Sequence, residues 1–265
     1  MADYNPLSLQ PQIITIALVT IILLSLSLAY FLKVRKQQED VAPKGMVLVV
    51  QIFINYIRNL VIEILGPKFE KITPFFVFLF SYILLSNLMG IVGFEPPTSS
   101  YTVTLTLAFV TWIGIFAVGI RFQKISFLRK FLISVKIKGK KIPVMINPLG
   151  FISVITPLIS LSFRLWGNIF AGSLIVLLWF YLWATIWNLI PVIGALNLLG
   201  GFMAFPIHAY FDLMVGTIQA LIFTMLTMIY WSLEIKEDAN TKQKVKIKKN
   251  PNVSELMTNN NINIK

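Results

Sequence analysis

The sequence predicts an all-α integral membrane protein with about five transmembrane helices and one interfacial helix. Of its 265 residues, 57% are hydrophobic and only 13% are charged, and the mean hydropathy is +0.78. Several apolar stretches of about twenty residues are long enough to cross a hydrocarbon core about 30 Å thick. With no room left for a soluble domain, we expect one membrane domain over residues 1–234. Residues 235–265 are basic and rich in Asn, and we expect them to form a disordered tail.

The first span is expected over 13–32. The residues before it, MADYNPLSLQPQ, lack the basic region and the small-residue cleavage site of a secretory signal peptide. The next apolar stretch, 46–65, carries Arg58 and Glu63 and lies between two clusters of charge. We therefore interpret it as an amphipathic helix that lies in the membrane interface.

Four further spans are expected over 74–94, 101–120, 148–183 and 195–233. The last two stretches are too long for upright helices, because about 36 residues make a helix of roughly 54 Å. Either each stretch forms two short spans, or each forms one steeply tilted or bent helix. Pro191 and Pro206 are the expected breaks.

Basic residues gather in three parts of the chain. Of the 23 Lys and Arg residues, 22 lie within 33–71, 121–141 and 236–265. These segments alternate with charge-poor turns, as the positive-inside rule requires if the basic segments are cytoplasmic. We expect the N-terminus outside and the C-terminus in the cytoplasm. The net charge of +12 is explained by this topology, so binding of nucleic acid is not expected.

Two ionisable residues interrupt the apolar spans. Arg164 is the remaining cation, and placing an arginine at the centre of a membrane helix costs about 2.5–3.5 kcal/mol. Asp212 is the only acid inside a predicted span, on the following helix. Intramembrane ionisable residues usually mark ion pathways, so we expect both to be functional.

Polar and small residues accompany both charges at helical spacing. One stripe contains Ser160, Arg164, Asn168 and Ala171, and the other contains His208, Asp212, Gly216, Gln219, Phe223 and Thr227. If the chain reverses near residue 190, Gln219 and Arg164 lie at similar depth and Asp212 lies nearer the outside. The pattern predicts a polar track from the outside, through Asp212, to a central Arg164.

Structural interpretations of the same residues stay open. Arg164 and Asp212 could form a buried ion pair that fixes helix packing, although such pairs add little stability. For Asn87, Asn168 and Gln219, ordinary hydrogen bonding between helices and a role in conduction are equally good explanations. We interpret His208 as a packing residue, because it follows Pro206 near the expected helix break.

Three segments carry a specific resemblance. RLWGNIFAG (164–172), TIQALIFTMLTMIY (217–230) and LLSNLMGIVGFEPPTSSYTVTLTLAF (84–109) resemble subunit a of the bacterial F-type ATP synthase, over most of 70–234. The resemblance implies a C-terminal hairpin of two long tilted helices, curved around a rotating ring of c subunits. It also implies a stator that offers two half-channels and couples proton flow to ring rotation.

The resemblance assigns residues to this pathway. Arg164 matches the arginine that faces the ring carboxylates, and Asn168, Gln219, Tyr230 and Asn87 match polar positions of the pathway. The implied partners are the c ring, the b subunits of the peripheral stalk, the rest of the F1F0 complex and lipids. The implied location is the bacterial plasma membrane. No cofactor or metal is implied.

The chain departs from this pattern at one position. AGSLIV places Ser173 where many bacterial relatives of this kind have a relay carboxylate, and they commonly have histidine where this chain has Asp212. Because a serine hydroxyl cannot titrate in this range, we expect Asp212 to carry the relay alone.

Two other classes of function stay open. An independent proton-coupled transporter would also place an arginine and an acid in its core, but would work without a ring. A purely structural subunit would tolerate the loss of both charges. The chain has no cysteine, phosphate-binding loop, metal-ligand cluster or nucleophile–base pair, so we do not expect it to catalyse a reaction itself.

Overall fold

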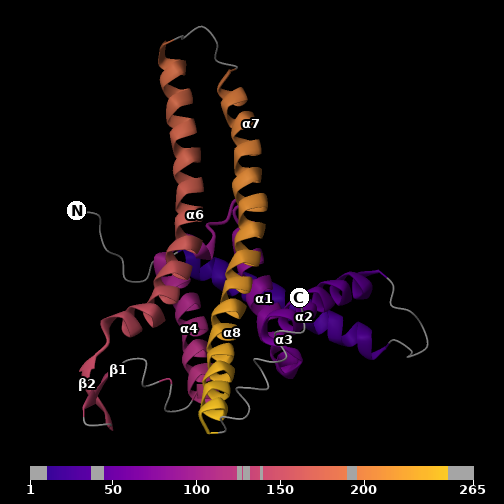
Figure 1. Cartoon of the computed structure of the whole chain (residues 1–265). Coiled ribbons are helices and arrows are strands. Elements are labelled where there is room, and N and C mark those ends of the chain that lie inside the picture. The colour runs from indigo at the N-terminus through magenta and orange to yellow at the C-terminus, as the bar shows by residue number, and fades with distance from the viewer. Residues whose placement is uncertain are drawn as a thin grey trace, which may run out of the picture.

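The computed structural model describes residues 11–36, 45–123, 127, 132–137, 140–189 and 196–249. Its elements are α1 (Pro11–Arg35), α2 (Met46–Leu65), η1 (Pro67–Ile72), α3 (Thr73–Leu88), η2 (Pro97–Ser99), α4 (Tyr101–Gln123), β1 (Leu132–Ile137), β2 (Lys140–Ile146), α6 (Pro148–Leu189), α7 (Leu196–Ala209), η3 (Tyr210–Val215) and α8 (Gly216–Lys249). Figure 1 shows α6 and α7 side by side, projecting away from the other helices, and α8 continuing from α7 past α4.

The described residues contain six helices that are long and apolar enough to cross a membrane. They match the five predicted spans and the predicted interfacial helix in order and position, so the all-α membrane fold is confirmed. Helix α2 buries Ile57, Val61 and Leu65, at a spacing of four residues, while Arg58 and Glu63 are exposed. This one-sided burial suits a helix that packs on the core along a single stripe. Its location in the interface stays a prediction.

Each of the two longest apolar stretches is helical without interruption. Helix α6 contains 42 residues and passes through Pro157 without ending. At 1.5 Å per residue its path is about 63 Å long, twice the thickness of the hydrocarbon core, so it must tilt, bend or project from the membrane. The interpretation as pairs of short spans is therefore wrong.

The predicted break at Pro206 is also wrong. Pro206 lies inside α7, and the irregularity follows it as a π-helical segment, η3, from Tyr210 to Val215. A π-helical turn bonds each residue to one five positions away, and such turns often occur at functional sites. Asp212 lies inside η3. Pro191 lies outside the described residues.

A buried tryptophan anchors α8 to its neighbours. The indole Nε1 of Trp231 donates to the carbonyl oxygen of Thr111 on α4 at 3.1 Å, and its ring stacks on Phe75 of α3 with centroids 5.5 Å apart. A Cβ at Gly114 would overlap this ring, so only glycine admits it. These contacts set the position of α8 against α3 and α4, and thus the depth of the polar residues on α8.

Two segments differ from the expectation. Between α4 and α6, strands β1 and β2 form an antiparallel hairpin that pairs Leu132 with Ile146, which the sequence reasoning did not predict. Alternation and β-branched residues in LISVKI favour this pairing. Helix α8 runs to Lys249, so residues 235–249 are helical and the predicted disorder is wrong there. Extending an existing helix costs little, and lysines suit its C-terminal end. Residues 250–265 lie outside the described residues.

Candidate functional site

Arg164 lies on an exposed face of α6. Its side chain is exposed, and the neighbouring Phe163 and Phe170 are each 51% exposed. Arg164 makes no hydrogen bond or ion pair with any residue that the structure describes, Asp212 included. The interpretation of Arg164 and Asp212 as a packing ion pair is therefore wrong. The cation instead faces outward from an apolar surface.

One turn further along α6, an amide pair joins the two long helices. Asn168 Nδ2 donates to Gln219 Oε1 on α8 at 2.7 Å. The Gln219 side chain is 2% exposed, and its Nε2 has no partner among the described residues. Since Asn168 follows Arg164 by four residues, this bond holds the arginine's helix at a set position against α8.

The side chain of Asp212 extends from η3 to the turn that follows α3. It is 16% exposed, and Oδ2 lies 3.5 Å from His208 Nδ1, which is within ion-pair range but makes no hydrogen bond. A Cβ at Gly90 would lie 2.6 Å from the same Oδ2. Helix α3 ends at Leu88, six residues earlier than predicted, and this early end brings Gly90 against the acid.

A buried polar cluster continues from this point. Asn87 is fully buried, and its Nδ2 donates to the carbonyl oxygen of Gly216 at 3.0 Å. Thr98 Oγ1 donates to Asn87 Oδ1 at 2.8 Å. Both amide atoms of Asn87 are therefore used in contacts that join α3, η2 and α8. These contacts bear out the interhelical interpretation of Asn87 and place it beside Gly216, four residues after Asp212.

Ser173 and Tyr230 lie at the margins of this arrangement. Ser173 Oγ donates to the carbonyl oxygen of Ile169 at 3.0 Å, within its own helix. The preceding residue, Gly172, packs against Phe211, and a Cβ there would lie 3.2 Å from that side chain. Positions 173 and 212 thus belong to segments of α6 and η3 that touch. Tyr230 is half-buried and packs against the core.

Three residues near Asp212 were missed or misread from the sequence. The sequence placed His208 four residues before Asp212 on one helical stripe, but we interpreted it as a packing residue, and its Nδ1 lies 3.5 Å from the acid. Gly90 and Thr98 carried no periodic signal, because they lie in turns whose path depends on packing. Within the described part of the chain, no three His, Asp or Glu side chains are placed to bind a metal ion.

The family model for the ATP synthase A chain matches residues 13–232, which is most of the chain. The chain belongs to this family. ATP synthase subunit a of Mycoplasmoides gallisepticum is 38% identical over 250 residues, covering 91% of this chain and 84% of that protein. The same subunit of Mycoplasma pneumoniae is 38% identical over 238 residues, covering 88% of this chain and 81% of that protein. That of Bacillus pumilus is 30% identical over 207 residues, covering 71% of this chain and 80% of that protein.

Membership of the ATP synthase A chain family confirms the resemblance found in the sequence. The chain is a proton-translocating stator subunit of the F0 sector, it crosses the membrane several times, and it is not itself catalytic. It works with the rest of the F1F0 complex. The alternative of an independent transporter is not favoured.

Proposed function

We propose that Arg164 is the fixed charge that separates two proton half-channels and faces the carboxylates of a c-subunit ring. The observation that carries the proposal is the exposed Arg164 side chain, which has no partner among the described residues on an otherwise apolar face. A charge in hydrocarbon is unfavourable unless an anion or water meets it. A carboxylate on a second chain supplies that anion.

Arginine suits this position for a physical reason. It keeps its proton even when it is desolvated, whereas a lysine can be neutralised by burial. A permanent cation favours the ionised form of each ring carboxylate that passes it. The same charge repels a proton that would otherwise cross directly from one half-channel to the other.

Asp212 is the proposed relay in the outer half-channel. It lies within η3 beside His208 and Gly90. Gly216 follows it by four residues, and Asn87 of α3 donates to the Gly216 carbonyl oxygen there. The Asn168–Gln219 pair continues the polar path towards Arg164. Tyr230 lies three helical turns beyond Gln219 on α8, and we propose it for the other side of the pathway. The Ser173 hydroxyl donates a hydrogen bond within its own helix and does not titrate.

The remaining assignments follow from the same proposal. The c ring would lie on the exposed face of α6 and α8, and b subunits would join the chain to the peripheral stalk. We place the chain in the bacterial plasma membrane with its N-terminus outside and its C-terminus in the cytoplasm, because the three basic segments then follow the positive-inside rule.

The decisive experiment uses vesicles that carry the whole complex with Arg164→Ala. ATP-driven acidification and passive proton permeability are followed together, and Arg121→Ala, at the exposed end of α4, is the matched control. We expect Arg164→Ala to abolish acidification in an assembled complex, while Arg121→Ala pumps normally. A rise in passive leak would show that Arg164 is also the barrier. Unchanged pumping in Arg164→Ala would disprove the proposal.

A further inference from the structure

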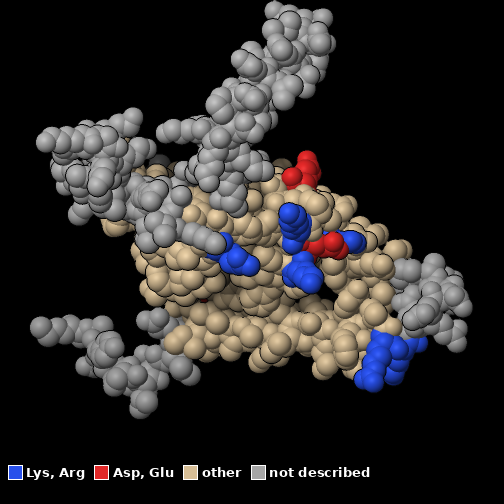
Figure 2. All heavy atoms as spheres, turned by 60° about the horizontal axis from the view of Figure 1, so that its bottom comes forward, with Lys and Arg blue, Asp and Glu red and all other residues tan. Residues whose placement is uncertain are grey.

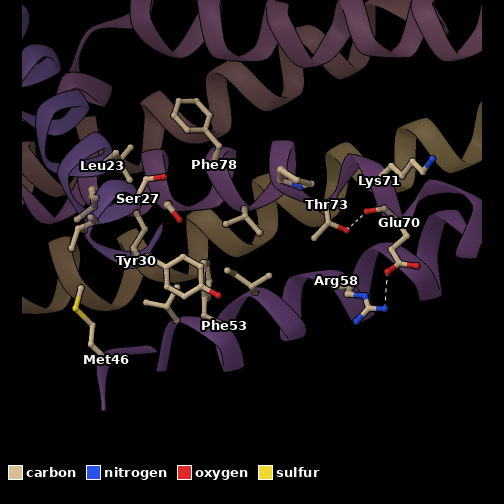
Figure 3. A pocket seen from close by; sticks show the side chains of 18 of the residues that line it. Leu23, Ser27, Tyr30, Met46, Phe53, Arg58, Glu70, Lys71, Thr73 and Phe78 are labelled. Atoms are coloured by element: carbon tan, nitrogen blue, oxygen red, sulfur yellow. Dashed lines mark hydrogen bonds and ion pairs between the residues drawn. The ribbon is translucent and has the colours of Figure 1, made fainter. Parts of the chain in front are cut away.

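A groove with a volume of about 1220 Å³ lies between α1, α2, η1 and α3. None of the candidate proton-pathway residues lines it, so it is separate from the site described above. Figure 3 shows its labelled apolar side chains, such as Leu23 and Phe78, away from the charged side chains Arg58, Glu70 and Lys71. The groove therefore has an apolar body and a charged end.

The apolar body is formed mainly by α1 and α3. Leu23 and Leu26 line it from α1, and Val77, Phe78 and Leu85 line it from α3. Phe78, on the membrane helix α3, is 56% exposed. Such a surface favours contact with a hydrocarbon chain.

The charged end carries a net positive charge. Arg58 Nη2 lies 2.6 Å from Glu70 Oε1, so these two charges neutralise each other. Lys68 and Lys71 also line the groove, both are exposed, and neither makes an ion pair with a described residue. Figure 2, which turns the bottom of Figure 1 forward, shows most of the visible blue and red side chains close together on a largely tan face, with one blue group apart from them.

We propose that this groove binds one anionic phospholipid. Its acyl chains lie along α1 and α3, and its phosphate lies between Lys68 and Lys71. Lysine side chains near a membrane surface attract anionic lipid headgroups. Arg58 contributes little net charge, because Glu70 already pairs with it.

The length of the groove favours a lipid over a helix of a partner protein. Along α3 the lining extends from Thr73 to Leu85. These twelve steps make about 18 Å at 1.5 Å per residue, close to the half of a 30 Å hydrocarbon core that one leaflet fills. A partner's transmembrane helix spans about 30 Å of hydrocarbon and would extend beyond the groove. The groove thus suits a ligand of one leaflet.

The test uses phosphatidylglycerol with a photoreactive group on its acyl chain, added to vesicles that carry the whole ATP synthase. Crosslinked peptides are mapped by mass spectrometry. Phosphatidylcholine with the same reactive chain is the matched probe, because it lacks the net negative charge. The variant is Lys68→Gln with Lys71→Gln, and the matched control is Arg35→Gln with Arg121→Gln, two exposed cations that do not line the groove.

We expect phosphatidylglycerol to label α1 and α3 along the groove about tenfold more than phosphatidylcholine does. The double lysine variant should remove that excess, and the double arginine control should keep it. Retained ATP-driven acidification would show that the lysine variant is assembled. Equal labelling by both probes, or labelling unchanged in the lysine variant, would disprove the proposal. So would a photoreactive residue at Ser81 that captures another polypeptide instead of lipid.

Discussion

The carboxyl group of Asp212 lies directly against the backbone of Gly90, and a Cβ at position 90 would come within 2.6 Å of Oδ2. This contact joins the turn after α3 to the π-helical segment η3. It explains why a glycine stands in a turn where backbone freedom is otherwise not required, since Gly90 has no positive φ. The available space, and not the backbone conformation, selects glycine here.

Replacing Gly90 by alanine should displace the Asp212 side chain. A shift of about 1 Å in a group that transfers protons can cost up to a hundredfold in rate, so we expect ATP-driven acidification to fall at least about tenfold. Vesicle acidification measures this, with the amount of assembled complex determined in the same preparation. Ile91→Ala is the neighbouring control, because Ile91 is 39% exposed. Normal pumping by Gly90→Ala would show that this contact does not position the acid.

Asp212→Asn should nearly abolish pumping, because asparagine keeps the shape of the side chain but cannot exchange a proton. Ser173→Ala should reduce pumping only slightly, since the Ser173 hydroxyl bonds within its own helix. Initial rates of acidification in assembled complexes compare the two. The reverse ranking would place the relay on α6 rather than on η3.

His208→Ala should slow pumping several-fold but less than Asp212→Asn does. His208 Nδ1 lies 3.5 Å from Asp212 Oδ2 and is the nearest ionisable partner of that acid in the described chain. General acid–base partners typically contribute about a hundredfold or more when they transfer the proton themselves. A smaller loss would identify His208 as a residue that orients Asp212. His208→Gln, which keeps a hydrogen-bonding group, should recover part of the rate.

Gly114→Ala should destabilise the subunit without a specific defect in pumping per assembled complex. The added methyl group overlaps the Trp231 ring, and overpacking of this kind costs about 1–3 kcal/mol. Thermal unfolding of the purified complex and the yield of assembled complex measure the effect. Gly167→Ala is the matched control for stability, because nothing lies within 4 Å of a Cβ at that position. Equal stability of the two variants would contradict the packing of Trp231.

Hydropathy and charge were sufficient to predict the order and position of the membrane helices. The length of α6 limited its orientation, but the choice between one long helix and two short spans could not be made from hydropathy. Pro206, which the sequence offered as a break, lies inside α7, and Pro157 lies inside α6. Proline disfavours a helix interior because it has no N–H to donate and its ring clashes with the preceding turn, whereas a membrane helix that packs on a neighbour, as α6 packs on α4, tolerates it. Sequence alone could not separate these cases.

The candidate site was predicted in part. The two stripes at helical spacing identified Asn168, Asp212 and Gln219 as candidates. Asn168 and Gln219 are hydrogen-bonded to each other in the structure. The close approach of Gly90 and the bond from Thr98 depend on where a turn passes after α3 ends. Such contacts join segments more than a hundred residues apart or lie between turns, and no local periodicity reports them.

The π-helical segment also fixes how the two ends of one continuous rod are rotated about their common axis. Each π-type bond encloses one residue more than an α-type bond, and one residue corresponds to about 100° of helical rotation. Deleting a single residue within Tyr210–Val215 would therefore turn the face of α7 that meets α6 by roughly a quarter of a circle against Gln219 and Trp231. The segment thus sets the rotation of α7 relative to α8, and an insertion or deletion there would separate Asp212 from its surroundings while leaving the side chains of α8 in place.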